Sequence, residues 1–324
     1  MLPERRTTSR KMTSEIAGRA AKIHALSRFE FQVNASHRGL SLAECIARQL
    51  LVSADEAADL IDFVSVQLDG RAERNPQKKL VGGEQVKIFW PLYGTERFYE
   101  ISSRRILFCD PYLLAYNKES GIPSQQIPAD AYNNLFAALY RFLAKENPAP
   151  YVALHHRLDR ETSGVMLFAI DRSVNRKLGN AFKNHKIEKD YLAWVEGSPA
   201  RDEWVSTDDI GRKAGRCRIL PRGQGKRAET WFKVLLRKTD RAIVRARPKT
   251  GRTHQIRLHL SSTGHPVIGD RLYGKGASGN LRLHAYRLSL VHPATSEKLV
   301  VTAPIPEDWP APHSFAVWPE GGFY

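Results

Sequence analysis

Short strand-forming and helix-forming segments alternate along most of the chain, and this mixture narrows the choice of fold more than any other property of the sequence. Between residues 40 and 91, two apolar patterns of helical period precede segments of strand period. From residue 102 onward, hairpin, helix and strand patterns follow one another. A chain of 324 residues exceeds one average domain, so we expect one large mixed α and β domain and a smaller module.

The smaller module is predicted over residues 28–91. Leu42, Ile46 and Leu50 share one helical face, and Ser53 is a plausible N-cap of a second helix. The alternating segment VSVQLDGR has a turn at Asp69-Gly70, and the strand VKIFW follows a Gly82-Gly83 turn. This order resembles the alpha-L motif, a small RNA-binding domain first known in ribosomal proteins. The Arg-Leu-Asp start of that motif is absent here. A structural cap without an RNA role is the alternative.

Charge indicates the class of partner. The net charge is +16 and the pI about 9.9, and residues 201–260 hold 17 Lys and Arg against 6 Asp and Glu. Such an excess attracts polyanions, so nucleic acid is the leading partner, and a merely soluble basic protein is the alternative. Residues 1–27 are expected to form a basic flexible tail; a mitochondrial transit peptide is disfavoured because Glu4 and Glu15 interrupt the pattern.

Three dispersed cysteines form no CxxC pair, which disfavours a disulfide framework and a thiolate metal site and favours a cytoplasmic setting. No apolar run approaches the length of a membrane span, so no membrane association is expected.

A polar loop in the second half carries the first candidate site. In HHRLDRETSG, Asp159 lies between Arg157 and Arg160 ahead of the apolar strand VMLFAI. Neighbouring guanidinium groups lower the pKa of a carboxyl group, which suits a nucleophile or a general base. An Asp held in a surface salt bridge is the alternative.

A second cluster follows at residues 245–274. The segment THQIRLHLSS is expected to start a helix with Thr253 as N-cap and Ile256 and Leu260 on one face. Arg252, His254 and Arg257 would then surround the first turn, where helix amides favour an anion such as phosphate. A solvated basic helix start is the alternative.

Six segments together carry a family resemblance that runs from about residue 105 to about residue 306. In chain order they are HRLDRETSG, KDYLAWVEG, GKRAETWFKV, TGRTHQIRLH, GHPVIGDRLYG and LRLHAYRL. Their order is similar to that in the pseudouridine synthases that modify large-subunit ribosomal RNA and transfer RNA. The resemblance implies an α+β fold for residues 92–324, with a mixed, mostly antiparallel sheet flanked by helices and a cleft across the sheet.

The resemblance also implies the site residues. Asp159 matches the catalytic aspartate, Tyr191 the active-site tyrosine and Arg257 the arginine that pairs with the aspartate. Asp159 would attack C1′ of the ribose or C6 of the base, Tyr191 would stack on the base, and Arg157, Arg160, Arg252 and His254 would bind the substrate. The target nucleotide would be flipped from its stack. The isomerisation needs no metal and no organic cofactor.

One stretch departs from the family pattern. Glu119 stands where members commonly have a proline, and QQIPADAYNN replaces their glycine-rich stretch, which weakens assignment of the substrate by subgroup. The dispersed histidines do not indicate zinc, because His254 and His259 are five residues apart and no HExxH pattern occurs.

Three functions stay open at this level. An active pseudouridine synthase, expected to be a monomer acting on structured ribosomal or transfer RNA, is the leading hypothesis. An RNA-binding or RNA-chaperone protein on the same fold and a metal-dependent RNA-processing enzyme are the others. Asp159, Tyr191 and Arg257 together favour the first, since binding alone needs no carboxylate in a groove that meets phosphate.

Overall fold

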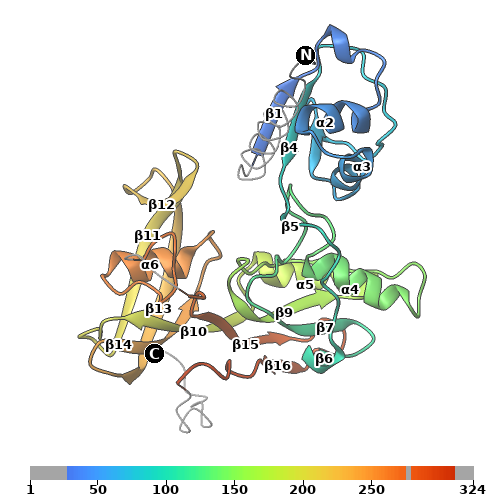
Figure 1. Cartoon of the computed structure of the whole chain (residues 1–324). Coiled ribbons are helices and arrows are strands. Elements are labelled where there is room, and N and C mark those ends of the chain that lie inside the picture. Colours follow the sequence, from blue (N-terminus) through green and yellow to red (C-terminus); the bar gives the residue numbers. More distant parts are fainter. Residues whose placement is uncertain (1–27, 275–278, 311–324) are drawn as a thin grey trace, which may run out of the picture. The chain divides into compact units, whose positions relative to one another are not determined.

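The computed structural model describes residues 28–274 and 279–310, which form two compact units. Unit 1 contains residues 28–100 together with Gln125–Ala138, and unit 2 contains Ile101–Ser124 and the described residues from 139 onward (Figure 1). The predicted basic tail, residues 1–27, lies outside the described residues. The division at residues 91 and 92 stays a prediction.

Unit 1 combines a small antiparallel sheet with two helices. The sheet has the order β1-β4-β2-β3, and β5 follows it. The elements are β1 (Arg28–Gln32), the 3₁₀ turn η1 (Ala35–His37), α2 (Leu42–Leu50), α3 (Ala54–Asp62), β2 (Val66–Leu68), β3 (Arg71–Ala72), β4 (Gln85–Phe89) and β5 (Leu92–Thr95).

Both helices of unit 1 begin with capping boxes. The hydroxyl of Ser41 accepts from the Glu44 amide, and that of Ser53 from the Glu56 amide, while each glutamate bonds back to the serine amide. These reciprocal bonds satisfy amides that the first helical turn leaves unpaired. The predicted N-cap at Ser53 and the predicted turn at Asp69-Gly70, between β2 and β3, are therefore confirmed.

Residues 125–134, the QQIPADAYNN part of the stretch that departs from the family pattern, belong to unit 1, whereas Glu119 lies in unit 2. Ser65 Oγ donates to the carbonyl of Ala129 at 2.6 Å, and the rings of Phe63 and Tyr132 pack with centroids 5.1 Å apart. The amide oxygen of Asn133 accepts from the backbone of Phe98. Residues 125–134 thus complete a unit whose other residues precede position 101.

Unit 2 is built on a large sheet. Within the described residues it has eleven strands, nine of them in the order β12-β11-β13-β14-β10-β15-β9-β7-β6, with β16 beside β15 and β8 beside β9. The strands are β6 (Ile106–Cys109), β7 (Leu113–Lys118), β8 (Ala153–Leu154), β9 (Ser163–Ala169), β10 (Glu188–Glu196), β11 (Glu203–Lys213), β12 (Arg216–Leu220), β13 (Lys226–Arg237), β14 (Arg241–Pro248), β15 (Leu283–Val291) and β16 (Lys298–Thr302).

The sheet is mixed and mostly antiparallel, as the resemblance implied, and the fold is α+β. The described parallel pair is β15 with β9, where His284 lies opposite Ser163 and Ala285 opposite Gly164. The β15–β9 pair joins two antiparallel parts of the large sheet. The hairpin pattern expected after residue 102 is confirmed as β6 and β7, which are joined by a turn at Asp110-Pro111.

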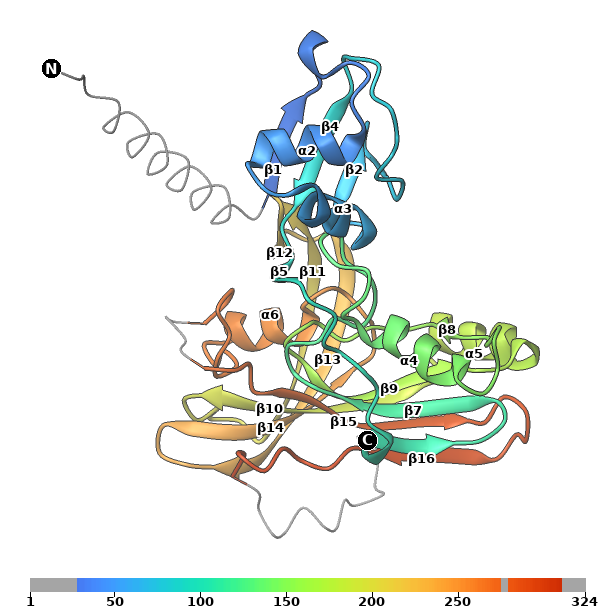
Figure 2. The same cartoon turned by 45° about the vertical axis from the view of Figure 1, so that its right-hand side comes forward.

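Helices cover one side of this sheet. They are α5 (Arg172–Lys183) and α6 (Gln255–Ser262), which lie on the same side of the strands (Figure 2). Val174 and Leu178 of α5 pack on β9, and Ile256 and Leu260 of α6 pack on β10 and β14. The remaining helical elements are η2 (Ser103–Arg105) and α4 (Leu135–Ala144).

Asp171 caps α5 by accepting from the Ser173 amide. The fold confirms one further sequence prediction, because Ile256 and Leu260 share the buried face of α6, and it corrects another. Thr253, however, does not cap α6. His254 is the N-cap in the left-handed region, and its side chain makes no capping bond. In the described part of the chain, no helix combines the length and the apolar character needed to cross a bilayer.

Candidate active site

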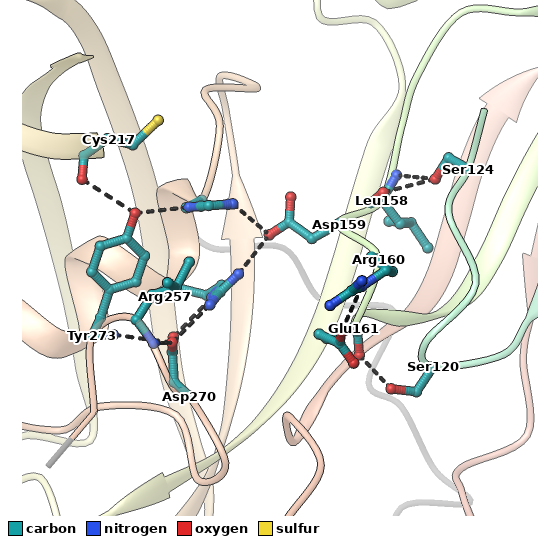
Figure 3. Close-up of polar contacts among 12 residues, drawn as sticks. Ser120, Ser124, Leu158, Asp159, Arg160, Glu161, Cys217, Arg257, Asp270 and Tyr273 are labelled. Atoms are coloured by element: carbon teal, nitrogen blue, oxygen red, sulfur yellow. Dashed lines mark hydrogen bonds and ion pairs between the residues drawn. The ribbon is translucent and has the colours of Figure 1, made fainter. Parts of the chain in front are cut away.

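The Asp159 loop connects β8 to β9 on the helix-covered side of the sheet. A turn bond from the Thr162 amide to the Asp159 carbonyl, 3.0 Å long, shapes its tip. Ser124 holds the residue before Asp159, because its hydroxyl accepts from the Leu158 amide at 3.0 Å and lies 2.7 Å from the Leu158 carbonyl (Figure 3). Ser120 donates to the carbonyl of Glu161 on the other flank. The backbone is therefore fixed on both sides of the carboxylate.

A buried lysine ties the same loop to β7. Lys118 is fully buried, and its ammonium donates to the carbonyls of Glu119, Ile122 and Arg160 at 2.7 to 3.0 Å. Burial lowers the pKa of Lys118 to about 7. Three accepting carbonyls match the three protons of the charged amine, so the group acts as a backbone clamp.

Gly164 sets the start of β9. Its φ of +110° is one that residues with a side chain rarely adopt, and a Cβ here would overlap the carbonyl of Ala285 on β15. The close approach allows β9 to pair with β15 immediately after the loop.

Asp159 and Arg257 form the centre of the site. Nη1 of Arg257 lies 3.2 Å from Oδ2 of Asp159 (Figure 3). The Asp159 side chain is 28% exposed and that of Arg257 is 6% exposed. A buried cation therefore holds one oxygen of a carboxylate that is itself partly exposed to solvent.

Asp270 holds Arg257 in place, and sequence reasoning missed it. Its carboxylate accepts from Nε and Nη2 of Arg257 at 2.8 and 2.7 Å. Burial raises the pKa of Asp270, but the Arg257 bonds and the amides of Leu272 and Tyr273 outweigh burial and lower it overall. For Arg257, burial lowers the pKa, and Asp270 and Asp159 reverse the effect, so its pKa lies above the ordinary value.

A local signal for Asp270 was present in the sequence. The residue follows Gly269, whose φ is +77° and whose missing side chain makes room for the Asn280 carbonyl. A carboxylate directly after a glycine in GHPVIGDRLYG marks a tight turn with a charged group, although nothing local identifies Arg257 as its partner.

Tyr191 lies in β10, with Ala246 of β14 and Ala285 of β15 as its neighbours across the sheet. Burial and then the negative charge of Asp159 raise the pKa of Tyr191 above its usual value. The hydroxyl therefore keeps its proton near neutral pH. The ring packs against the core that α6 covers.

Among the four predicted substrate-binding residues, His254 is the one whose side chain is paired with the Asp159 carboxylate. Its Nε2 is 3.8 Å from Oδ2 of Asp159, and its Nδ1 is 2.7 Å from the hydroxyl of Tyr273. Tyr273 also lies 3.2 Å from the Cys217 carbonyl, and its ring faces the guanidinium of Arg257 at 5.3 Å.

The other three predicted binding residues form no ion pair with Asp159. Arg157 is exposed, Arg160 pairs with Glu161 at 2.8 Å, and Arg252 donates to the carbonyl of Arg227 at 3.0 Å. Among the described residues, Arg257 is the arginine that forms an ion pair with Asp159, and neither Arg157 nor Arg160 pairs with it. Both are neighbours of Asp159 along the loop, and both side chains are exposed.

The described residues contain no group of three or more His, Cys, Asp or Glu arranged to hold a metal ion.

Comparison with known proteins bears on the same residues. The family model for RNA pseudouridylate synthase matches residues 112–262, a range that includes Asp159, Tyr191 and Arg257. An uncharacterized RNA pseudouridine synthase of Bacillus subtilis is 37% identical over 211 residues, which span 63% of this chain and 73% of the relative. Ribosomal large subunit pseudouridine synthase C of Escherichia coli is 33% identical over 304 residues, covering 79% of this chain and 92% of that protein.

A solved structure agrees with the fold. Human RNA pseudouridylate synthase domain containing 4 superposes with a TM-score of 0.54 at 27% identity, covering 63% of this chain and 90% of that one. Fold, motif order and the relatives agree, and the chain belongs to the RNA pseudouridylate synthase family, whose members isomerise uridine to pseudouridine in RNA.

Proposed function

We propose that this protein isomerises specific uridines in structured ribosomal or transfer RNA, with Asp159 as nucleophile, Arg257 as its charge partner and Tyr191 against the base. The observation that carries the proposal is that Arg257 bonds to two carboxylates. Asp270 fixes the buried guanidinium of Arg257, which in turn holds the partly exposed carboxylate of Asp159. Ribosomal RNA is the first candidate, because relatives at 33% and 29% identity are named as large-subunit synthases.

The reaction breaks the N1–C1′ bond, turns the base while it is held and forms a C5–C1′ bond. The C5 proton is then lost and N1 gains a proton, so no electrons are exchanged. Asp159 can attack C1′ of the ribose, displacing the base at N1, or add to C6 of the base; on either route the bond to Asp159 is broken again before the product leaves, which returns the carboxylate. Arg257 serves both routes by holding that carboxylate in place. The ring of Tyr191 stacks on the base. Because the pKa of Tyr191 is raised, its hydroxyl keeps its own proton, and it can accept the C5 proton only by passing that first proton onward.

The remaining proposals concern partners and setting. Arg157, Arg160 and Arg252 bind substrate phosphate, since cations near a reacting carboxylate attract RNA. Residues 28–91 add RNA contacts outside the site, as their resemblance to the alpha-L motif suggests. We further propose a monomer that acts in the cytoplasm.

Mapping pseudouridines in cells with and without the gene tests the function. Carbodiimide labelling and primer extension should show specific sites that vanish with the gene and return with the wild-type protein but not with Asp159→Asn. Sites that persist without the gene would contradict the proposal. Chelation by EDTA should leave purified activity unchanged, whereas its loss would favour a metal-dependent enzyme.

A further inference from the structure

The two oxygens of Asp159 have different surroundings. Oδ2 faces Nη1 of Arg257 at 3.2 Å and Nε2 of His254 at 3.8 Å. Among the described residues, Oδ1 forms no hydrogen bond or ion pair, and it points away from Arg257 (Figure 3). One oxygen is therefore held from two sides, and the other is open to a substrate.

The backbone of His254 is unusual for its residue type. Its φ of 57° and ψ of 21° lie in the left-handed region, where a side chain costs about 1 kcal/mol or more. As N-cap of α6 it also makes no side-chain capping bond. Asparagine would suit both the left-handed backbone and the N-cap. The imidazole thus has no local structural advantage at this position.

The hydrogen bond to Tyr273 orients the ring. Burial lowers the pKa of His254, and the charges of Arg257 and Arg212 add to the effect, while those of Asp159 and Asp270 oppose it. A neutral ring carries one N–H. The carboxylate of Asp159 favours that proton on Nε2, which leaves Nδ1 as an acceptor. The single proton of the Tyr273 hydroxyl then goes to Nδ1 at 2.7 Å rather than to the Cys217 carbonyl, which lies farther from that hydroxyl, at 3.2 Å.

We propose that His254 is a positioning residue whose Nε2–H, oriented by Tyr273, joins Arg257 in holding Oδ2 of Asp159 and so directs Oδ1 at the substrate. The inference rests on Asp159 being the nucleophile. It gives His254 a role different from binding substrate phosphate, and it makes Tyr273 part of the same arrangement. Hydrogen bonds of this kind commonly tighten in the substrate complex.

Two substitutions of His254 separate this role from its alternatives. The amide nitrogen of His254→Gln can occupy the place of Nε2, whereas that of His254→Asn reaches only the place of Nδ1. We expect His254→Gln to keep the single-turnover rate on a saturating RNA stem-loop within about twofold, and His254→Asn to lose roughly tenfold, the order of one hydrogen bond. RNA affinity should change little in either variant.

A purely structural role of His254 predicts the opposite order of single-turnover rates for the two variants. His254→Asn should melt at the same or a higher temperature than the wild type, because asparagine suits a left-handed N-cap. If His254→Asn kept the full rate while His254→Gln lost it, the residue would act through the backbone and the proposal would be overturned. If both variants lost RNA affinity equally and kept the wild-type rate at saturating RNA, His254 would be a phosphate-binding residue, and the proposal would again be overturned.

Tyr273→Phe provides a second measurement. It keeps the ring that faces Arg257 and removes the hydroxyl that orients His254. The rate should fall in the wild-type background and change little further in His254→Asn, because both changes remove the same interaction. Additive losses would overturn the proposal. Asp159→Asn, measured in parallel, separates failure of the proposed function from failure of this inference. Normal turnover by Asp159→Asn would show that Asp159 is not the nucleophile, whatever the rates of the His254 variants.

Discussion

At the scale of single residues, the site depends on a guanidinium shared by two carboxylates. Asp270 is fully buried and binds Arg257 through two hydrogen bonds, so it fixes the cation. Asp159 is the more exposed partner and accepts a single, longer bond. Asp270 therefore has a structural role, and Asp159 remains accessible to a substrate.

Removal of Arg257 should affect stability and activity for separable reasons. Arg257→Ala leaves Asp270 buried without its cation, which should cost about 3 to 5 kcal/mol of unfolding free energy. Adding Asp270→Asn removes the stranded charge and should restore most of that loss. Activity should stay low in both variants because Asp159 still lacks its partner, and RNA affinity should change far less. Recovery of turnover in the double variant, measured beside urea unfolding, would contradict this role.

At the scale of elements, local patterns predicted most helices and strands but not their long-range partners. Apolar spacing predicted α2 and the buried face of α6, Ser53 as an N-cap predicted α3, and Asp69-Gly70 predicted the turn between β2 and β3. Strand β1 was missed, because RFEFQ is short and its partner β4 lies more than 50 residues along the chain. Tyr191 and Arg257 could be named from the family resemblance, whereas Asp270 and the hydrogen bond from Tyr273 to His254 depend on tertiary packing, which spacing does not encode.

The junction of β9 with β15 should tolerate no side chain at residue 164. Gly164→Ala introduces both an unfavourable φ and an overlap with the Ala285 carbonyl, and we expect a loss of at least about 3 kcal/mol. Gly215→Ala is the matched control: its φ is also positive, at +75°, but nothing lies near the added Cβ, so about 1 kcal/mol is expected. Equal melting temperatures for Gly164→Ala and Gly215→Ala would count against a close approach of Gly164 to the Ala285 carbonyl.

A buried carboxylate on the opposite face of the sheet links three strands. Asp190 on β10 accepts from Arg245 and Arg247 of β14 and from Arg287 of β15 at 2.8 to 3.3 Å. Because adjacent strand residues face opposite sides, this cluster lies behind Tyr191. Burial raises the pKa of Asp190, yet the arginine bonds reverse that and lower it overall.

The lowered pKa fixes the direction of a pH effect. A carboxyl group whose folded pKa lies below the unfolded value of about 3.9 stabilises the protein above that pH, and the stabilisation is lost as the pH falls through the folded pKa. The stability difference between wild type and Asp190→Asn should therefore be large at pH 7 and shrink below about pH 4. Asp202→Asn, which breaks an exposed pair with Arg237, should cost at most about 1 kcal/mol at either pH. A pH-independent difference for Asp190→Asn would contradict the assignment.

At the scale of the whole molecule, the charge of +16 suits a polyanionic substrate larger than one nucleotide. Unit 1 contributes exposed cations in a short stretch after β2, at Arg71, Arg74, Lys78 and Lys79. Because residues 125–138 also belong to unit 1, substitutions test its role more cleanly than deletion of the N-terminal residues.

Neutralising these four cations with alanine should weaken binding of a long structured RNA and flatten its dependence on salt. The slope of log affinity against log salt should change by up to about 3 to 4, which is about 0.7 to 0.9 for each of the four phosphates that would no longer be neutralised. The single-turnover rate on a short saturating stem-loop should stay the same. Lys87→Ala is the control, because that ammonium lies 3.6 Å from Glu30. An unchanged slope would leave unit 1 as a structural cap.

The most direct test of the central assignment is release of the C5 proton from RNA labelled with tritium at C5 of uridine, under single turnover. Asp159→Asn should fold, bind the RNA with nearly wild-type affinity and release no tritium above the background. Glu161→Gln, which changes a partly exposed side chain in the same loop, should release it at the wild-type rate. Tritium release by Asp159→Asn at a rate comparable with wild type would contradict the account, because no other carboxylate is proposed to start the reaction.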